Sequence, residues 1–166
     1  QNYLSEKPLV TQHETFIKAK HNAEGLCADL KNNRLLVAVK DRDPVNNDTK
    51  GIYAFDLETK QLQENPVFAI QLDDEIFTNL KTKNKLRIMM PSEVNIHPET
   101  GEIYVLDAKN PKLLILTPTG ETKKVYLLKE EKFYQPEGIA FRKNGSLFIS
   151  NEGHSDPANI LKVELQ

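Results

Sequence analysis

The chain of 166 residues has no tryptophan, two methionines, seven glycines and a single cysteine. One cysteine, Cys27, excludes a disulfide bond within the chain, and its position between Leu26 and Ala28 predicts a buried thiol. The apolar runs have the length of strands and fall far short of the roughly 20 residues that a membrane-spanning helix needs. We therefore expect no transmembrane segment in this chain.

An excess of charge of one sign is also missing. The chain carries 22 basic and 24 acidic residues, for a formal net charge of −2. This balance provides no field that would attract nucleic acid, which we do not expect as a partner. The sequence also has no Gly-x-Ser-x-Gly elbow, no phosphate-binding Gly-Lys-Ser/Thr loop and no Cys-x-x-Cys pair, so nothing in it supports nucleophilic catalysis.

What the sequence does contain is a repeat. Segments starting near residues 22, 91 and 136 each lead through a polar turn into an apolar run, and a further apolar strand follows in each. In the first two units a fourth strand completes the pattern, at 67–72 and 123–128. Four-stranded antiparallel units repeated at about 45 residues are typical of β-propeller blades, because one such sheet cannot bury both of its faces alone.

The predicted fold is therefore all-β: one partial β-propeller domain over residues 1–166, with about three blades and part of a preceding one. We predict blades at 22–72, 90–128 and 135–166, a blade remnant at 1–21 with strands at 15–19 and within 2–10, and an insertion at 73–89 with a short helix around 74–80. A closed ring typically has about four or more blades. We thus expect an open blade face that missing blades or a second copy would cover; the alternative fold is an open antiparallel sandwich.

These residues resemble the SdiA-regulated family of bacterial propellers, in the wider group of six-bladed, TolB-like and phytase-like propellers. The resemblance rests on AEGL at 23–26, KGIYAFD at 50–56, PSEV at 91–94, HPETGEIY at 97–104, PEGI at 136–139 and LFISNEG at 147–153. It implies an exported protein of the periplasm or cell envelope, whose early blades and lipoprotein signal or lipid anchor would lie upstream of Gln1. It implies no particular reaction, since propellers serve many functions.

Polar residues recur where the first strand of each unit begins and where the second ends. We predict a ligand-binding surface there, near the propeller axis, and list its candidates: Glu24, Lys40, Glu93, Asp107, Glu137, Asn151, Glu152 and His154. Carboxylates that converge on an axis repel one another unless a cation neutralises them, so we predict a Ca²⁺ site at Glu24, Glu137 and Glu152. Alignment of Pro91 with Pro136, however, sets Ser92 rather than Glu93 opposite Glu137.

The structural alternative is that these glutamates bond backbone amides at strand ends. The loop at 41–48 is rich in oxygen atoms but lacks the glycine and the closing glutamate of an EF-hand, which favours a solvated hairpin tip. His97 lies in a His-Pro turn, where a structural role is ordinary.

Three functions follow as hypotheses. The first is a binding propeller at the bacterial envelope whose ligand is a small molecule, a metal ion or a protein. The second is a calcium-dependent phosphoesterase similar to β-propeller phytases, in which carboxylates hold metal ions that bind phosphate and activate water. The third is a scaffold for protein interactions, which predicts neither a metal nor a small-molecule pocket.

Overall fold

The computed structural model describes residues 9–80, 82, 84–153 and 157–166 and contains three antiparallel sheets. The first sheet is β1 (Ala23–Asp29), β2 (Arg34–Val39), β3 (Thr49–Asp56) and β4 (Phe68–Gln71). The second is β5 (Pro91–Ile96), β6 (Ile103–Asp107), β7 (Lys112–Leu116) and β8 (Thr122–Leu127). The third is β9 (Pro136–Phe141), β10 (Leu147–Asn151) and β11 (Asn159–Val163).

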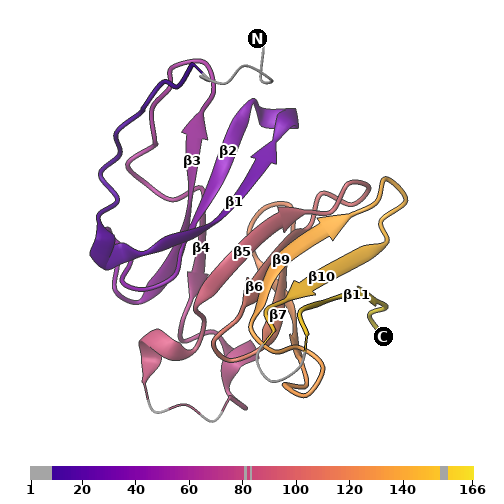
Figure 1. Ribbon diagram of the computed structural model, residues 1–166. Coiled ribbons are helices and arrows are strands. Elements are labelled where there is room, and N and C mark those ends of the chain that lie inside the picture. Colours follow the sequence, from indigo (N-terminus) through magenta and orange to yellow (C-terminus); the bar gives the residue numbers. More distant parts are fainter. Residues whose placement is uncertain (1–8, 81, 83, 154–156) are drawn as a thin grey trace.

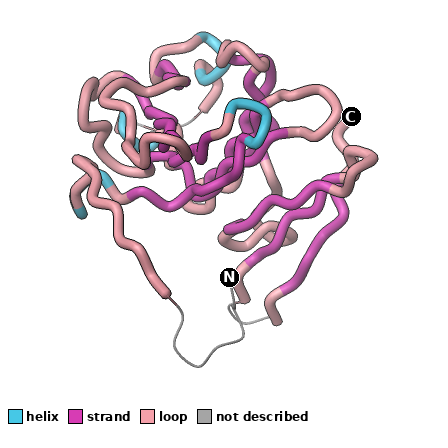
Figure 2. Tube along the Cα trace, turned by 90° about the horizontal axis from the view of Figure 1, so that it is seen from above, coloured by secondary structure: helices cyan, strands magenta, loops and turns pink. Residues whose placement is uncertain are grey.

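Neighbours in each sheet are neighbours along the chain, so each sheet is a meander, as predicted for a propeller blade. The first strands of the blades, β1, β5 and β9, run side by side (Figure 1). Loops and turns join the strands, and the short helices lie outside the sheets, before β1 or in the connection between β4 and β5 or β1 and β2 (Figure 2). The all-β prediction of partial propeller blades is confirmed.

The two cores lie between successive blades. In β6 and β7, all five residues of each strand are buried, because blade 2 is covered on both faces. Val105 and Leu114 pack towards blade 1, whereas Leu106 and Leu113 pack towards blade 3. The period of two along a strand thus sends alternate side chains into the two cores. Cys27 is buried in the first of them, as predicted.

Side chains of β5 also bond the backbone of β9 directly. Asn95 Nδ2 donates to the carbonyl oxygen of Ile139 at 2.9 Å, and Ser92 Oγ donates to that of Pro136 at 3.1 Å. These bonds join the inner edges of blades 2 and 3, because the carbonyl groups at the edge of β9 have no further strand of their own sheet beside them.

The outer faces of blades 1 and 3 carry exposed apolar side chains. Leu26 is 58 % exposed on blade 1 and Ile160 is 73 % exposed on blade 3. A hollow of about 680 Å³ lies against the outer face of blade 1, between residues 13–19 and the side chains of Leu35, Val37 and Phe55. These are the blade faces that the fold leaves without a stacked neighbour.

The predicted strand at 15–19 was wrong. No strand occurs at residues 9–18, and Ala19–His21 is a 3₁₀ helix. No described strand pairs with this segment, and it makes aromatic contacts instead: the His13 ring lies 5.5 Å from Phe55, and Phe16 lies edge-on to Tyr53 at 5.6 Å. The prediction of a strand within 2–10 falls largely outside the described residues.

The insertion after blade 1 holds two short 3₁₀ helices, Glu75–Phe77 and Lys85–Arg87, where one was predicted around 74–80. Asp74 caps the first by accepting from Ile76 N at 2.9 Å, and it also accepts from Thr122 Oγ1 of β8. Lys85 pairs with Asp48 of blade 1 at 2.8 Å. The buried Phe77 and Met89 extend the core between blades 1 and 2. None of the described helices is long and apolar enough to cross a membrane.

Candidate functional site

The first strand of every blade carries a β-bulge close to its start. The bulges interrupt the register between Ala23 and Gly25 in β1, between Pro91 and Glu93 in β5, and opposite Ser150 and Asn151 in β9. The extra residues are Glu24, Ser92 and Glu137. Bulges turn side chains away from the regular alternation and are frequent beside binding sites. We call this end of the blades, where β1, β5 and β9 begin, the loop end.

Glu93 is not equivalent to the other two glutamates. The bulge places it at the position of Gly25 and Gly138, which confirms the alignment of Ser92 with Glu137. Glu93 Oε1 accepts a hydrogen bond from Val94 N at 2.7 Å. Burial raises the pKa of Glu93 and the charge of Glu137 raises it further, whereas hydrogen bonds from backbone amides lower it. Glu93 therefore matches the structural alternative, a strand-end glutamate bonded to backbone.

Glu24 and Lys40 form an ion pair at the loop end of blade 1. Glu24 Oε2 lies 2.7 Å from Lys40 Nζ, and Glu24 Oε1 accepts from Asn22 Nδ2 at 3.0 Å. The side chains are 29 % and 18 % exposed, so the pair is accessible to a ligand. Lys40 thus forms its ion pair with Glu24 in blade 1 and not with the carboxylates of blade 3.

Glu137 and Glu152 occupy the loop end of blade 3. Gln135 Nε2 donates to Glu152 Oε2, and Glu152 N donates to the carbonyl oxygen of Gln135 at 3.1 Å. Burial raises the pKa of Glu137; the charge of Lys40 lowers it, and the charges of Glu24 and Glu152 raise it. Glu137 thus feels charged groups from both blade 1 and blade 3, so the predicted residues of these two blades converge.

The described residues contain no group of three or more His, Cys, Asp or Glu side chains arranged to hold a metal ion. The predicted set of Glu24, Glu137 and Glu152 therefore does not form a ready coordination shell. Ca²⁺ binding at these residues stays a prediction.

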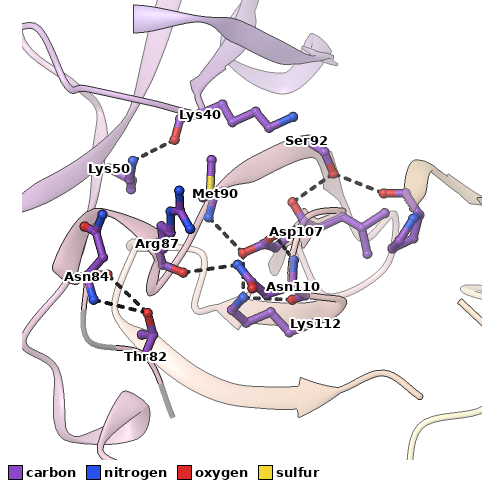
Figure 3. Close-up of polar contacts among 12 residues, drawn as sticks. Lys40, Lys50, Thr82, Asn84, Arg87, Met90, Ser92, Asp107, Asn110 and Lys112 are labelled. Carbon is purple, nitrogen blue, oxygen red and sulfur yellow. Dashed lines mark hydrogen bonds and ion pairs between the residues drawn. The ribbon is translucent and has the colours of Figure 1, made fainter. Parts of the chain in front are cut away.

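Asp107, a further candidate, has its carboxylate engaged within the protein. Its Oδ2 lies 2.5 Å from Lys112 Nζ and 2.9 Å from Met90 N, and its Oδ1 accepts from Asn110 N at 2.9 Å (Figure 3). Asp107 and Lys112 side chains are 0 % and 3 % exposed. Burial lowers the pKa of Lys112, and the nearby carboxylate opposes this effect. This arrangement fixes the turn between β6 and β7 to the start of β5.

Asn151 takes the place of Asp107 in blade 3, since it pairs with Pro136 as Asp107 pairs with Pro91. Its Nδ2 donates to Asn159 Oδ1 at 2.8 Å. Its Oδ1 is buried and has no hydrogen-bond partner within the described parts of the chain. A buried amide oxygen without a donor is costly, so this position lacks the backbone donors that satisfy Asp107 in blade 2.

Of the two histidines with predicted roles, the structure describes only His97. His154 lies outside the described residues. His97 Nδ1 accepts from Glu99 N and Thr100 N at 3.3 and 3.2 Å, and its ring packs against Tyr104 and Phe141. His97 therefore has the structural role that its turn indicated.

The loop at 41–48 is organised by Asp43. Asp43 Oδ1 accepts from Val45 N at 2.8 Å and from Tyr53 OH at 2.9 Å, and Oδ2 accepts from Gly51 N at 2.7 Å. Burial and the bond to Asp43 raise the pKa of Tyr53. These bonds turn the carboxylate of Asp43 towards the protein, in agreement with a hairpin loop.

Lys50 is a buried charge that the sequence analysis missed. It is 0 % exposed, and Nζ donates to the carbonyl oxygen of Lys40 at 2.6 Å (Figure 3). Nζ also donates to the carbonyl oxygen of Asp41. Burial lowers the pKa of Lys50, while the charges of Asp41 and Asp107 raise it. A lysine at a strand start is ordinarily solvated, so nothing in its sequence context indicates this burial.

Repeated meanders with adjacent first strands and polar residues gathered at one end define a β-propeller with a candidate ligand surface. The SdiA-regulated family model matches residues 5–155, and the chain belongs to this family. No curated protein matches the chain.

Proposed function

We propose that this chain is part of an envelope-associated β-propeller that binds its ligand at the loop end, through Glu24, Lys40, Glu137 and Glu152. The observation that carries the proposal is the repeated bulge at the start of the first strands, which sets Glu24 and Glu137 at equivalent positions of blades 1 and 3. A regular ladder would serve stability equally well. Bulges at this place are what a binding surface needs in order to direct side chains out of the sheet.

The balance of charge favours a cationic ligand. Lys40 is paired with Glu24, and although its charge also acts on Glu137, no lysine among the described residues forms an ion pair with Glu137 or Glu152. The raised pKa of Glu137 indicates that its ionised form is disfavoured in the free protein. A bound cation would favour that ionised form.

Calcium is the cation we propose first. Ca²⁺ takes six to eight oxygen ligands in flexible geometry and accepts waters and amide carbonyls beside carboxylates. Glu137 and Glu152 provide carboxylate oxygens at the loop end. Waters would complete the shell, since the carboxylates alone do not form one.

Calorimetric titration of the intact protein with CaCl₂ tests this proposal. We expect stoichiometric binding that Glu137→Gln weakens strongly and that Glu99→Gln, on an exposed turn at the other end of blade 2, leaves unchanged. Binding that is equal in both variants would refute the loop-end site, and no binding by the wild-type protein would refute the calcium ligand.

The envelope location rests on family membership, and fractionation of cells that make the native protein tests it. We expect the protein with the periplasm or membranes. Recovery in the cytoplasmic fraction alone would contradict it.

A further inference from the structure

A second cleft lies at the other end of the molecule, between blades 1 and 2. It has a volume of about 690 Å³ and is formed by the turn between β1 and β2, the turn between β5 and β6, and the side chains of Phe68, Ile96, Ile103 and Pro118. These four side chains give it an apolar floor. We call this end of the blades, where β1 leads into β2, the hairpin end.

A guanidinium group is held in this cleft by two contacts. Arg34 Nε donates to Asp29 Oδ2 at 2.7 Å, and the Arg34 guanidinium carbon lies 5.6 Å from the centre of the Phe68 ring. Asp29 is itself fixed, because Asn32 Nδ2 donates to the same Oδ2 at 2.8 Å. A planar guanidinium held at Nε and over a ring loses little further freedom when it binds a ligand.

The outer nitrogens of Arg34 are left for a ligand. Neither Nη1 nor Nη2 makes a hydrogen bond or ion pair with the residues described, whereas the side chain as a whole is 21 % exposed and lines the cleft. Lys31 lines the same cleft from the adjacent turn. Two free N–H-bearing nitrogens in one plane match the two oxygens of a carboxylate or phosphate.

The repeat shows that the propeller fold does not require this pair. The register places His97 and Glu102 of blade 2, and Arg142 and Ser146 of blade 3, at the positions of Asp29 and Arg34. Asp29 of blade 1 is buried, whereas Arg142 of blade 3 is exposed. A buried acid at this position thus belongs to blade 1 alone among the three blades.

The corresponding cleft between blades 2 and 3 has a different character. Its volume is about 370 Å³, and its lysine, Lys162, is already paired with Glu164 at 2.9 Å. Of these two clefts, the one at Arg34 is larger, and its guanidinium is fixed while both Nη atoms remain available. It is therefore the cleft suited to a ligand.

We propose that the cleft at the hairpin end binds a small organic acid, whose oxyanion lies on the Nη atoms of Arg34 and whose apolar body packs on Phe68 and Pro118. Asp29 acts as a positioning residue, since it orients the guanidinium from behind. This site goes beyond the proposed function: it lies at the opposite end of the blades from Glu137 and binds an anion instead of a cation, so either proposal can fail alone.

Titration of the isotope-labelled protein with benzoate and with phenyl phosphate, followed by NMR, tests the site and separates carboxylate from phosphate ligands. We expect shifts confined to residues near 29–34, 68, 96–101 and 118. Benzamide, which has the shape of benzoate without its charge, should bind at least about tenfold more weakly, since a charge-assisted hydrogen bond is lost.

The variants are Arg34→Gln, Arg34→Lys and the matched control Arg142→Gln in the equivalent turn of blade 3. We expect Arg34→Gln to weaken benzoate binding at least about tenfold and Arg142→Gln to leave it unchanged. Arg34→Lys keeps the charge without the planar pair of donors and should fall between them. It also serves if Arg34→Gln does not fold.

Three results would overturn the site: no shifts with either acid, equal binding of benzamide and benzoate, or undiminished binding in a folded Arg34 variant. The first would show that the Asp29–Arg34 pair only stabilises the turn between β1 and β2. The other two would show an apolar cleft in which the guanidinium takes no part.

Discussion

Asp107 Oδ2 and Lys112 Nζ lie 2.5 Å apart, at positions where the two side chains are 0 % and 3 % exposed. Both charges are thus removed from water, and each depends on the other. Removal of one partner from such a pair strands the other charge in the core, whereas an apolar replacement of both is frequently neutral.

Asp107→Asn should therefore lower the free energy of unfolding by about 3 kcal/mol or more, because Lys112 loses its counter-charge while it remains buried. The double variant Asp107→Leu/Lys112→Met should recover part of that loss, because it removes the stranded charge but leaves Met90 N and Asn110 N without their acceptor. Urea unfolding of the three proteins measures both effects. Lys162→Ala, which breaks the exposed pair with Glu164, is the control and should change stability by less than about 1 kcal/mol. A mild effect of Asp107→Asn would mean that water reaches Lys112.

The thiol of Cys27 should be inert in the folded protein. Burial and, to a smaller extent, the charges of Glu93 and Asp29 raise its pKa to about 12. Because the thiolate is the reactive form, labelling with a chromogenic disulfide at pH 8 should be slow in buffer and fast in denaturant. Rapid labelling of the native protein would show that blades 1 and 2 separate readily.

The repeat could be recognised in the sequence because every blade needs apolar strands and polar turns at the same positions. Short apolar runs joined by polar turns, such as the turn at Asn144 and Gly145, indicate strands that pair with their neighbours along the chain. This local pairing is why β4 (Phe68–Gln71) and β8 (Thr122–Leu127) lie close to their predicted positions, 67–72 and 123–128. The bulge that separates Glu93 from Glu137 was visible only as one misaligned residue, because nothing in the composition of Pro91–Ile96 marks a bulge.

Contacts between distant segments explain the remaining differences. Residues 15–19 include Thr15, Phe16 and Ile17, which favour strands, but no strand pairs with them, and composition cannot reveal the absence of a pairing partner. Lys50 reads as a surface lysine until the carbonyl groups of Lys40 and Asp41 are brought to it by the loop between β2 and β3. The Asp29–Arg34 pair became notable only once the cleft between two blades was known.

Protonation of Glu137 should stabilise the fold. Its pKa is raised in the native state, mainly by burial, so the native protein binds this proton more tightly than the unfolded chain does. Stability from this group is present below the unfolded pKa of about 4.3 and is lost as the pH rises through the higher native value. Glu137→Gln should therefore have a higher Tm than the wild type at pH 7.

Thermal unfolding at pH 7 and near pH 3.5 tests this dependence. The advantage of Glu137→Gln should largely vanish at the lower pH, where the wild-type carboxyl group is also neutral. Glu99→Gln, in the exposed turn at the hairpin end, should show no such change with pH. An advantage that is the same at both pH values would attribute the effect to packing instead of charge.

Gly145 should tolerate a methyl group less well than Gly101. Both have a positive φ, +76° and +72°, so alanine at either position costs about 1–2 kcal/mol of backbone strain. A Cβ at residue 145 would also lie 2.7 Å from His97 Nε2, whereas at residue 101 its nearest neighbour is a carbon of Pro118 at 3.7 Å. His97 is held by Tyr104 and Phe141 and has little room to move.

Gly145→Ala should therefore lose more stability than Gly101→Ala in urea unfolding, and the difference should shrink when His97 is replaced by alanine. Equal losses in the two variants would show that the His97 ring yields, and that the contact between blades 2 and 3 is softer than its packing indicates.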